Sequence, residues 1–594
     1  MAQSPENNSD GLIICNISSN GSKISDSFGI ISVWVRREVN KIGFAKIVLE
    51  AGNTPKQEIT ESDDETFALG RTITIEAGYK RGGKKIFEGV ISSHSLEIEE
   101  NENKLIIECR EFAYPMMLSK TNKVFENKKD SEVIRELIGG YNLEANVKST
   151  PLKYNDLVQY YCSDWDFMLS RSILNGMIVI TDGKNVNVAP PTLFSSPLLV
   201  VTYGKDMITF KGNRQTDRQA SDVEAYAVDS AKQKLVNERG SNPTLNEQGT
   251  LSSAQLTEAL GINQSILQTN MVTDESTLKS WADSQLLKAG LSRIIGEVKF
   301  QGNADAELGG TITLAGLSKH FNGDAFINMV EHEIKKGMWT TTAGIGLSPN
   351  IMDNNSNVMA SSTSALLPGI QGMHIGKIIK IDEDPDNENK LQVEISSLTG
   401  ENNKVWARLA TFWASNQYGA FFIPDIGDEV VLGFFNNNPC SPVILGSLYS
   451  SKQSPASGIQ KENNIRSIVT KSKLKIEFEE EKKNITITTP GNNIIELSDE
   501  GKSIKITDLN KNKIEMTNSG IAIESSQSLS LKAKTNIKID AGTNIDIRGK
   551  EALNLKATTI EASADTTFTA KGSAKAELSA AGQTVVKGAM VMIN

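Results

Sequence analysis

This 594-residue sequence is poor in the residues that most often build reactive or metal-binding sites, since it has only four cysteines and four histidines. The cysteines are widely scattered and form no CxxC pair, so we expect free, buried thiols rather than a disulfide framework or a zinc knuckle. No two histidines have the spacing of zinc ligands. The GxSxG and P-loop motifs are also missing. We therefore expect no catalytic residue, no cofactor and no bound metal.

Long apolar runs are missing as well. No stretch approaches the roughly 18 apolar residues of a membrane helix, and the N-terminus lacks the basic start and apolar run of a secretory signal peptide. We therefore expect a protein that is made in the cytoplasm and leaves it only when a machine carries it. A formal net charge of −10 argues against nucleic acid as a partner.

The last part of the chain lacks proline after Pro490, and beyond that point it has no Trp, Tyr, Cys or His. What it contains is a repeat, best seen in LSLKAKTNIKIDAGTNIDIRGKEALNLKA. Apolar residues stand eight apart and are each followed two positions later by another: Leu529 and Leu531, Ile537 and Ile539, Ile545 and Ile547, Leu553 and Leu555. Each unit reads as one short strand and one corner, which cannot bury its apolar face unless neighbours stack on it.

Two arrangements would bury these eight residues. Three consecutive units could form one coil of a single-chain β-helix, or three identical chains could each supply one face of a triangular prism. Alanine is common and aromatic residues are nearly absent after Lys471, which favours the thin prism over a broad single-chain coil. The eight residues are then the expected trimer core of a needle.

The rest of the sequence predicts a mainly β protein with several domains. We expect a strand-rich hub with two barrel-like modules and a few helices at 1–350, a polar linker at 351–370, and an OB-fold barrel at 371–450. A neck follows at 451–470, and the octapeptide-repeat β-helical needle occupies 471–594. Within the hub, Asp130 is the expected cap of one helix, and Ser163 or Asp164 the cap of another.

Several stretches resemble VgrG, the spike protein of type VI secretion, and the related spikes of contractile phage baseplates and extracellular injection systems. The hub contributes VFENKKDSEVIRELI and YCSDWDFMLSRSILNGMIV. The barrel contributes VWARLATFWAS and GAFFIPDIGDEVVLGFFNNNPCSPVILGSLY. The order of hub, OB barrel and repeats is the most specific part of this resemblance. The sequence leaves open which of these machines the chain serves.

The resemblance implies a homotrimeric, non-enzymatic spike that adapts a hexameric inner tube to a threefold needle. The implied partners are the tube protein and baseplate components at the hub, and a target membrane that is touched transiently during puncturing. Assembly into a contractile injection particle, with ejection on firing, would take the protein out of the cell. Effector cargo is a further implied partner.

The C-terminus is the expected docking surface for a PAAR-like tip protein. Val591, Met592, Ile593 and Asn594 remain strand-like and mostly apolar where a solvated tail would turn polar. A prism that stops abruptly exposes strand ends and an apolar face, which need a cover. The alternative is that Met592 and Ile593 of three chains plug their own prism.

Two alternative interpretations involve other chemistry. The first is an enzyme: a spike that carries a cell-wall hydrolase, or a β-helical polysaccharide-degrading enzyme. About 15–20 residues separate Tyr449 from the repeats, which is too few for an inserted catalytic domain. The second is a calcium loop at Asp382, Asp384 and Asp386, but Asn387 replaces the glycine and Val393 the closing glutamate of that motif. A solvated hairpin turn is the preferred interpretation.

Overall fold

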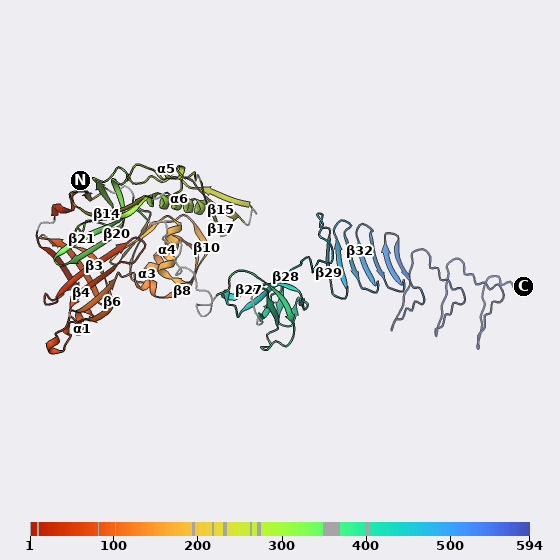
Figure 1. Ribbon diagram of the computed structural model, residues 1–594. Helices are drawn as coiled ribbons and strands as arrows, with labels where there is room; N and C mark the ends of the chain where they lie inside the picture. The colour runs from red at the N-terminus through yellow and green to blue at the C-terminus, as the bar shows by residue number, and fades with distance from the viewer. Residues whose placement is uncertain are drawn as a thin grey trace. The chain divides into compact units, whose positions relative to one another are not determined.

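A computed structural model describes residues 2–8, 11–80, 82–100, 102–192, 196–214, 216, 219–229, 234–261, 264–269, 275–347, 369–397 and 403–593. The protein is mainly β, as the sequence predicts (Figure 1). It divides into two compact units, Met1–Leu448 and Tyr449–Asn594. The predicted linker lies almost wholly outside the described residues. Within the described ranges, no helix is long and apolar enough to cross a membrane.

The first unit is built on a 13-stranded sheet that joins the strand-rich modules of the hub edge to edge. The sheet order is β14 (Met207–Arg214), β18 (Ile294–Gln301), β21 (Met338–Ile345), β20 (Gly323–Lys335), β3 (Ile30–Glu38), β4 (Phe44–Glu50), β7 (Asn103–Arg110), β6 (Gly82–Ile98), β5 (Thr72–Tyr79), β1 (Ile13–Ser19) and β2 (Ser22–Lys23). Strand β19 (Thr311–Ala315) pairs with both β20 and β13 (Leu199–Thr202). The antiparallel β3–β20 pair joins the two halves.

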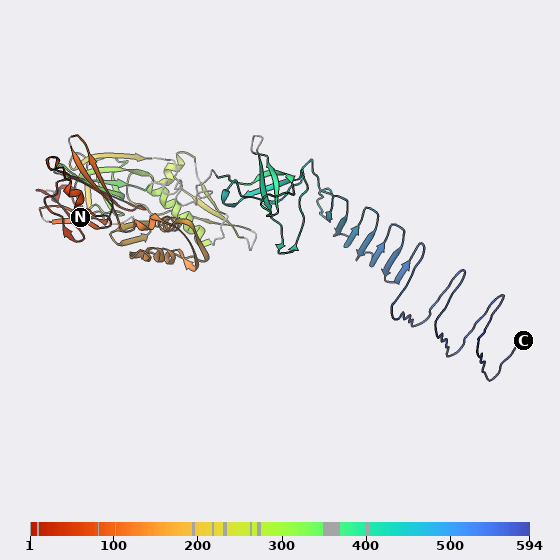
Figure 2. The ribbon, with the colours of Figure 1, turned by 90° about the horizontal axis from the view of Figure 1, so that it is seen from below.

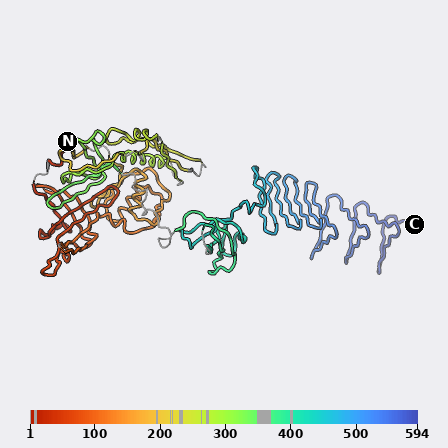
Figure 3. The backbone as a smooth tube through the Cα atoms, viewed as in Figure 1, coloured from red at the N-terminus to blue at the C-terminus, as the bar shows by residue number. Residues whose placement is uncertain are grey.

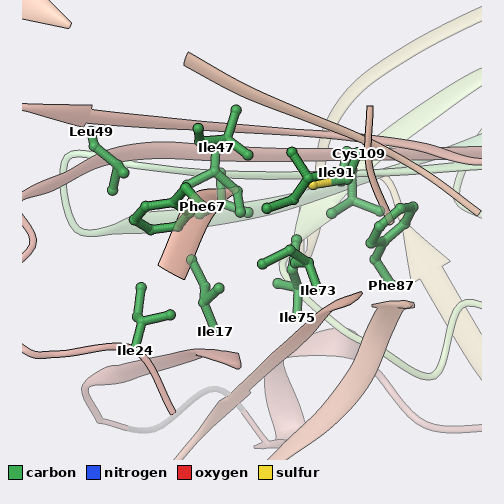
Figure 4. Close-up of a cluster of buried hydrophobic side chains, with 14 of the residues drawn as sticks. Ile17, Ile24, Ile47, Leu49, Phe67, Ile73, Ile75, Phe87, Ile91 and Cys109 are labelled. Carbon is green, nitrogen blue, oxygen red and sulfur yellow. The ribbon is translucent and has the colours of Figure 1, made fainter. Parts of the chain in front are cut away.

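Each half of this sheet has its own hydrophobic core. In the first, Phe67 lies among aliphatic side chains of the sheet, including Ile47 and Leu49 (Figure 4). In the second, Phe300 packs with Ile312 and neighbouring aliphatic residues. Alternate residues of each strand point inward because side chains alternate between the two faces of a sheet.

A mixed α/β segment follows β7 and has a third core, which includes Trp165 and Met168. Its elements are α2 (Pro115–Leu118), β8 (Lys120–Lys129), α3 (Asp130–Gly139), β9 (Glu144–Val147), β10 (Lys153–Ser163), α4 (Asp164–Leu174), β11 (Ile178–Asp182) and β12 (Asn185–Ala189). Farther along the chain, α6 (Glu275–Leu291) packs on a sheet of β15 (Val223–Asp229), β16 (Lys234–Arg239) and β17 (Ser265–Thr269). The short helices α1 (Thr60–Asp63) and α5 (Ser253–Glu258) lie in connections.

One of the two helix-cap predictions is correct and the other is wrong. The Ser163 side chain accepts the backbone N–H of Asp166 and caps α4, as predicted. Asp130 is instead the first residue of α3, and Lys129 is its cap. The Asp130 carboxylate is buried and accepts bonds from Arg171, with Nε at 2.7 Å, and from the Asn175 amide at 2.8 Å. The Asp130 carboxylate therefore forms an ion pair with Arg171 instead of capping the helix.

Residues 374–447 form the predicted small barrel, which is closed in the order β22-β23-β24-β28-β27. The strands are β22 (His374–Lys380), β23 (Lys390–Ile395), β24 (Lys404–Leu409), β27 (Glu429–Phe434) and β28 (Pro442–Ser447). Ile378, Val393, Leu432 and Ile444 lie in its core. A two-strand hairpin, β25 (Ala414–Ser415) and β26 (Tyr418–Gly419), leaves the barrel between β24 and β27 (Figure 2).

The second unit begins as a seven-stranded antiparallel meander of five-residue strands. These are β29 (Ile465–Val469), β30 (Lys475–Glu479), β31 (Asn484–Thr488), β32 (Ile494–Ser498), β33 (Ser503–Thr507), β34 (Lys513–Thr517) and β35 (Gly520–Glu524). Each turn has a residue with positive φ, which lies in the connection at Lys473, Lys483, Asn492, Lys502 and Lys511 and at the first residue of β35, Gly520, in the last turn. These left-handed residues turn the chain sharply at regular intervals.

Strand pairing within the chain ends at Glu524, although the sequence predicts strands to the C-terminus. From Ser525 to Ile593 the described backbone has no partner strand of its own chain. Figure 3 shows it turning back on itself in successive open loops. The backbone of the repeat turns at intervals, as expected, but its short segments do not pair with one another within a single chain.

Candidate assembly interface of the shaft

The meander β29–β35, which we call the shaft sheet, carries two columns of apolar side chains on one face. The first column consists of seven isoleucines, each directly opposite the next on the neighbouring strand: Ile468, Ile476, Ile487, Ile495, Ile506, Ile514 and Ile523. The second column begins with a charged residue and continues with apolar ones: Arg466, Phe478, Ile485, Leu497, Ile504, Met516 and Ile521. At the usual strand spacing the columns are about 29 Å long.

The opposite face of the shaft sheet is polar. Its central column consists of Ser467, Glu477, Thr486, Glu496, Lys505, Glu515 and Ala522. Glu515 pairs with Lys513 at 3.3 Å and with Lys505 at 3.4 Å. The hydrogen bond from Lys513, followed by that from Lys505, lowers the pKa of the Glu515 carboxyl. This ionised face is suited to water.

The apolar face of the shaft sheet is the more exposed of the two, which reverses the usual pattern of a half-buried sheet. The seven isoleucines of the first column are 36–54% exposed. Monomeric proteins rarely expose contiguous apolar patches of more than a few hundred Å². The shaft sheet therefore has an apolar face that its own chain leaves uncovered.

The apolar residues of the predicted needle core are likewise uncovered in a single chain. The eight residues Leu529, Leu531, Ile537, Ile539, Ile545, Ile547, Leu553 and Leu555 are 51–68% exposed. The first residue of each pair is less exposed than the second in all four repeats. At the predicted tip, Val591, Met592 and Ile593 are also exposed, whereas Asn594 lies outside the described residues.

The two columns of the shaft sheet do not follow a constant period in the sequence and were not predicted. The isoleucines are separated by 8, 11, 8, 11, 8 and 9 residues, because an antiparallel meander alternates short and long paths between facing positions. A search for a constant period of eight does not detect this pattern. Alternating spacings that sum to about 19 would have identified it.

The carboxylate run at 382–386 forms the predicted hairpin turn. The Asp384 carboxylate accepts backbone N–H groups of Asp386, Glu388 and Lys390 at 2.7–3.1 Å. Desolvation acts to raise the pKa of Asp384, but these backbone bonds outweigh it and lower the pKa. The Lys390 ammonium pairs with Asp386 and Glu388. Within the described ranges no three His, Cys, Asp or Glu side chains gather as a metal site.

The hub contains buried polar groups that serve packing. The Glu111 carboxylate is buried between strands and accepts Arg37 Nε at 3.1 Å and the Gly43 N–H at 2.9 Å. Desolvation raises its pKa, against the opposing charge of Arg37. His332 is also buried, with Nδ1 at 2.9 Å from Thr341 Oγ1. These two groups join elements of the hub. The other three histidines, His94, His320 and His374, bond to Ser62, Thr250 and Ser397 respectively.

Comparison with known proteins gives two family matches on this chain. The family described as the Alg8 N-terminal domain matches residues 9–336. The family described as the type VI secretion system/phage-baseplate injector OB domain matches residues 374–449. A curated relative, the type VI secretion system spike protein VgrG3 of Vibrio cholerae serotype O1, is 37% identical over 68 residues. That match spans 11% of this chain and only 7% of the relative.

Solved structures are similar at low identity. A 43 kDa tail protein of prophage MuSo2 from Shewanella oneidensis matches with a TM-score of 0.44 and 10% identity, over 57% of this chain and all of that one. A chain of the lidded PdpA–VgrG complex from Francisella matches with a TM-score of 0.38 and 10% identity, over 87% of this chain and 80% of that one.

Proposed function

The chain belongs to the Alg8 N-terminal domain family and is a VgrG-like spike protein with a baseplate-type OB domain, and on that premise we propose that three copies assemble into the puncturing spike of a contractile injection machine. The hub, barrel and shaft then have separate tasks. The hub receives the inner tube, the barrel forms a collar, and the shaft transmits force to the target membrane.

The observation that carries this proposal is the uncovered apolar face of the shaft sheet. Three copies that turn their two columns toward a shared axis bury this face and leave the ionised faces in water. Each copy supplies one side of a triangular prism, and the eight repeat residues from Leu529 to Leu555 continue its interior. Strands without partners in their own chain gain them from the neighbouring copies.

The hub is the proposed adaptor. Two sheet modules per chain, taken three times, give six similar elements around one axis, which suits a hexameric tube protein and the surrounding baseplate. This requires no catalytic step, and we propose a mechanical rather than an enzymatic role. The protein would be assembled inside the cell and ejected with the tube when the machine fires.

The tip is the proposed attachment point for a PAAR-like protein, and through it for effector cargo. Val591, Met592 and Ile593 are apolar and exposed at the end of the repeat. A prism whose end is apolar requires a cover, and a tip protein provides both the cover and a sharpened point.

The proposal is tested by the mass of the purified full-length protein in light scattering. We expect three times the mass of one 64.6 kDa chain, over a wide range of dilution. A full-length protein that is monomeric throughout that range would contradict the spike.

A further inference from the structure

The hairpin β25–β26 presents a cluster of exposed aromatic side chains on the small barrel. Phe412, Trp413, Tyr418, Phe421 and Phe422 are 56–85% exposed. The legs of the hairpin hold them together, since the Ala420 N–H donates to the Trp413 carbonyl at 2.9 Å and the rings of Trp413 and Tyr418 meet edge to face. Figure 2 shows the two short strands at the end of a loop that leaves the barrel. We call this cluster the aromatic hairpin.

The size of the aromatic hairpin fits a protein interface. A buried aromatic side chain removes about 150–250 Å² from water, so five rings at these exposures present roughly 700 Å². A standard protein interface buries about 800 Å² on each partner. Aromatic residues are also enriched at the centres of such interfaces.

The same barrel has a second apolar surface, on the outer side of β22, β27 and β28. The inward residues of these strands fill the core, and four of the outward ones are also apolar: Ile375, Val431, Val443 and Leu445. The charged pair Lys377 and Glu429 borders this apolar surface on the same face. Ile375 lies opposite Val431, and Val443 lies opposite Gly433. A Cβ added at Gly433 would lie 3.2 Å from Leu445 Cδ1, so the Leu445 side chain packs closely over the glycine. We call this surface the barrel wall.

We infer that the aromatic hairpin of one copy packs on the barrel wall of the next copy. Two different patches on one molecule make a heterologous contact, and a heterologous contact that closes on itself forms a ring. Three barrels in such a ring make a closed collar in which each hairpin and each wall is covered once. This inference rests on the proposed trimer and adds the surfaces that join its barrels.

The hairpin that packs on the barrel wall belongs to a second copy rather than to another protein, because copies that share one shaft have their barrels tethered beside one another. Only 15 residues separate Tyr449, at the end of the barrel segment, from Ile465, where the shaft sheet begins. An extended chain of that length spans no more than about 55 Å. Each of the three barrels is therefore tethered within about 55 Å of one shaft axis, which allows each barrel wall to meet a neighbour's hairpin.

The test is photo-cross-linking in the full-length protein with p-benzoylphenylalanine in place of Phe421. Co-expression of heavy- and light-isotope chains distinguishes links between copies from links within one. We expect links between copies that map to β22, β27 or β28. The same probe in place of Glu388, on the exposed turn between β22 and β23, is the matched control and should give none.

A substitution on the barrel wall provides a second test of this contact. Leu445→Glu should reduce the Phe421 link by at least about tenfold, because it places an unpaired charge under the rings. Leu445 is half exposed in the single chain, so the barrel core is untouched. A trimer whose Phe421 probe links only within its own chain, or to lipid or another protein, overturns the collar contact and leaves the spike standing. A monomeric protein overturns both.

Discussion

Ile487 and Thr486 are neighbours on β31 that point to opposite faces of the shaft sheet. Ile487→Lys places an ammonium group in the proposed dry interior, three times around one axis, and we expect it to destabilise the trimer by at least about 2 kcal/mol per chain. Thr486→Lys adds the same side chain on the polar face, between Glu477 and Glu496, and should change stability by no more than about 0.5 kcal/mol. Thermal unfolding and resistance to SDS measure the difference. Equal effects of the two exchanges would show that the apolar face is not the interior.

His332 gives the hub a predictable pH dependence. Burial, and secondarily the charge of Arg37, lowers the pKa of His332 to about 3, whereas an unfolded histidine has a pKa near 6.5. Below that value the unfolded state binds a proton that the folded state excludes, so stability is complete above about pH 6.5 and falls as the pH drops toward 3. The loss is at most about 1.4 kcal/mol per pH unit. His332→Gln should flatten the thermal-unfolding profile between pH 6.5 and 4.5. A variant with the same slope as the parent would assign the acid sensitivity to another group.

At the scale of elements, the four closing residues of the repeat can be removed without touching the shaft sheet. Deleting Val591–Asn594 should leave the mass of the proposed trimer unchanged and should abolish pull-down of a PAAR-like tip protein, because the apolar end that we propose as its docking surface is gone. Removing residues 1–8 from the other end of the chain is the matched control and should leave tip binding intact. Undiminished tip binding by the shortened needle would place the docking surface elsewhere.

The elements differ in how far local sequence determines them. The barrel strands and α4 were predictable, because alternation and the Ser163 cap are local signals. Asp130 was misassigned, because its partner Arg171 is 41 residues away and no local pattern reveals that pairing. The isoleucine columns escaped detection because their register follows from hairpin geometry rather than from a fixed period. The octapeptide core was visible in sequence, but its burial depends on other copies of the chain.

At the scale of the whole molecule, the two units differ in whether a single chain buries their apolar side chains. The hub and the barrel bury their cores within one chain. The shaft sheet and the repeats do not, and their fold is therefore proposed to exist only as an assembly. We therefore expect the assembled protein to be most stable in the shaft sheet and the repeats, which are the segments that are least compact in a single chain.

Hydrogen–deuterium exchange of the full-length protein tests this claim most directly. Residues 525–593 have no strand partner in their own chain, so any lasting protection of their amides must come from neighbouring copies. We expect peptides from this segment to exchange as slowly as those of the shaft sheet, and more slowly than the exposed loops of the hub. Exchange of 525–593 at the rate of an unstructured chain, in protein that is otherwise folded, would contradict it.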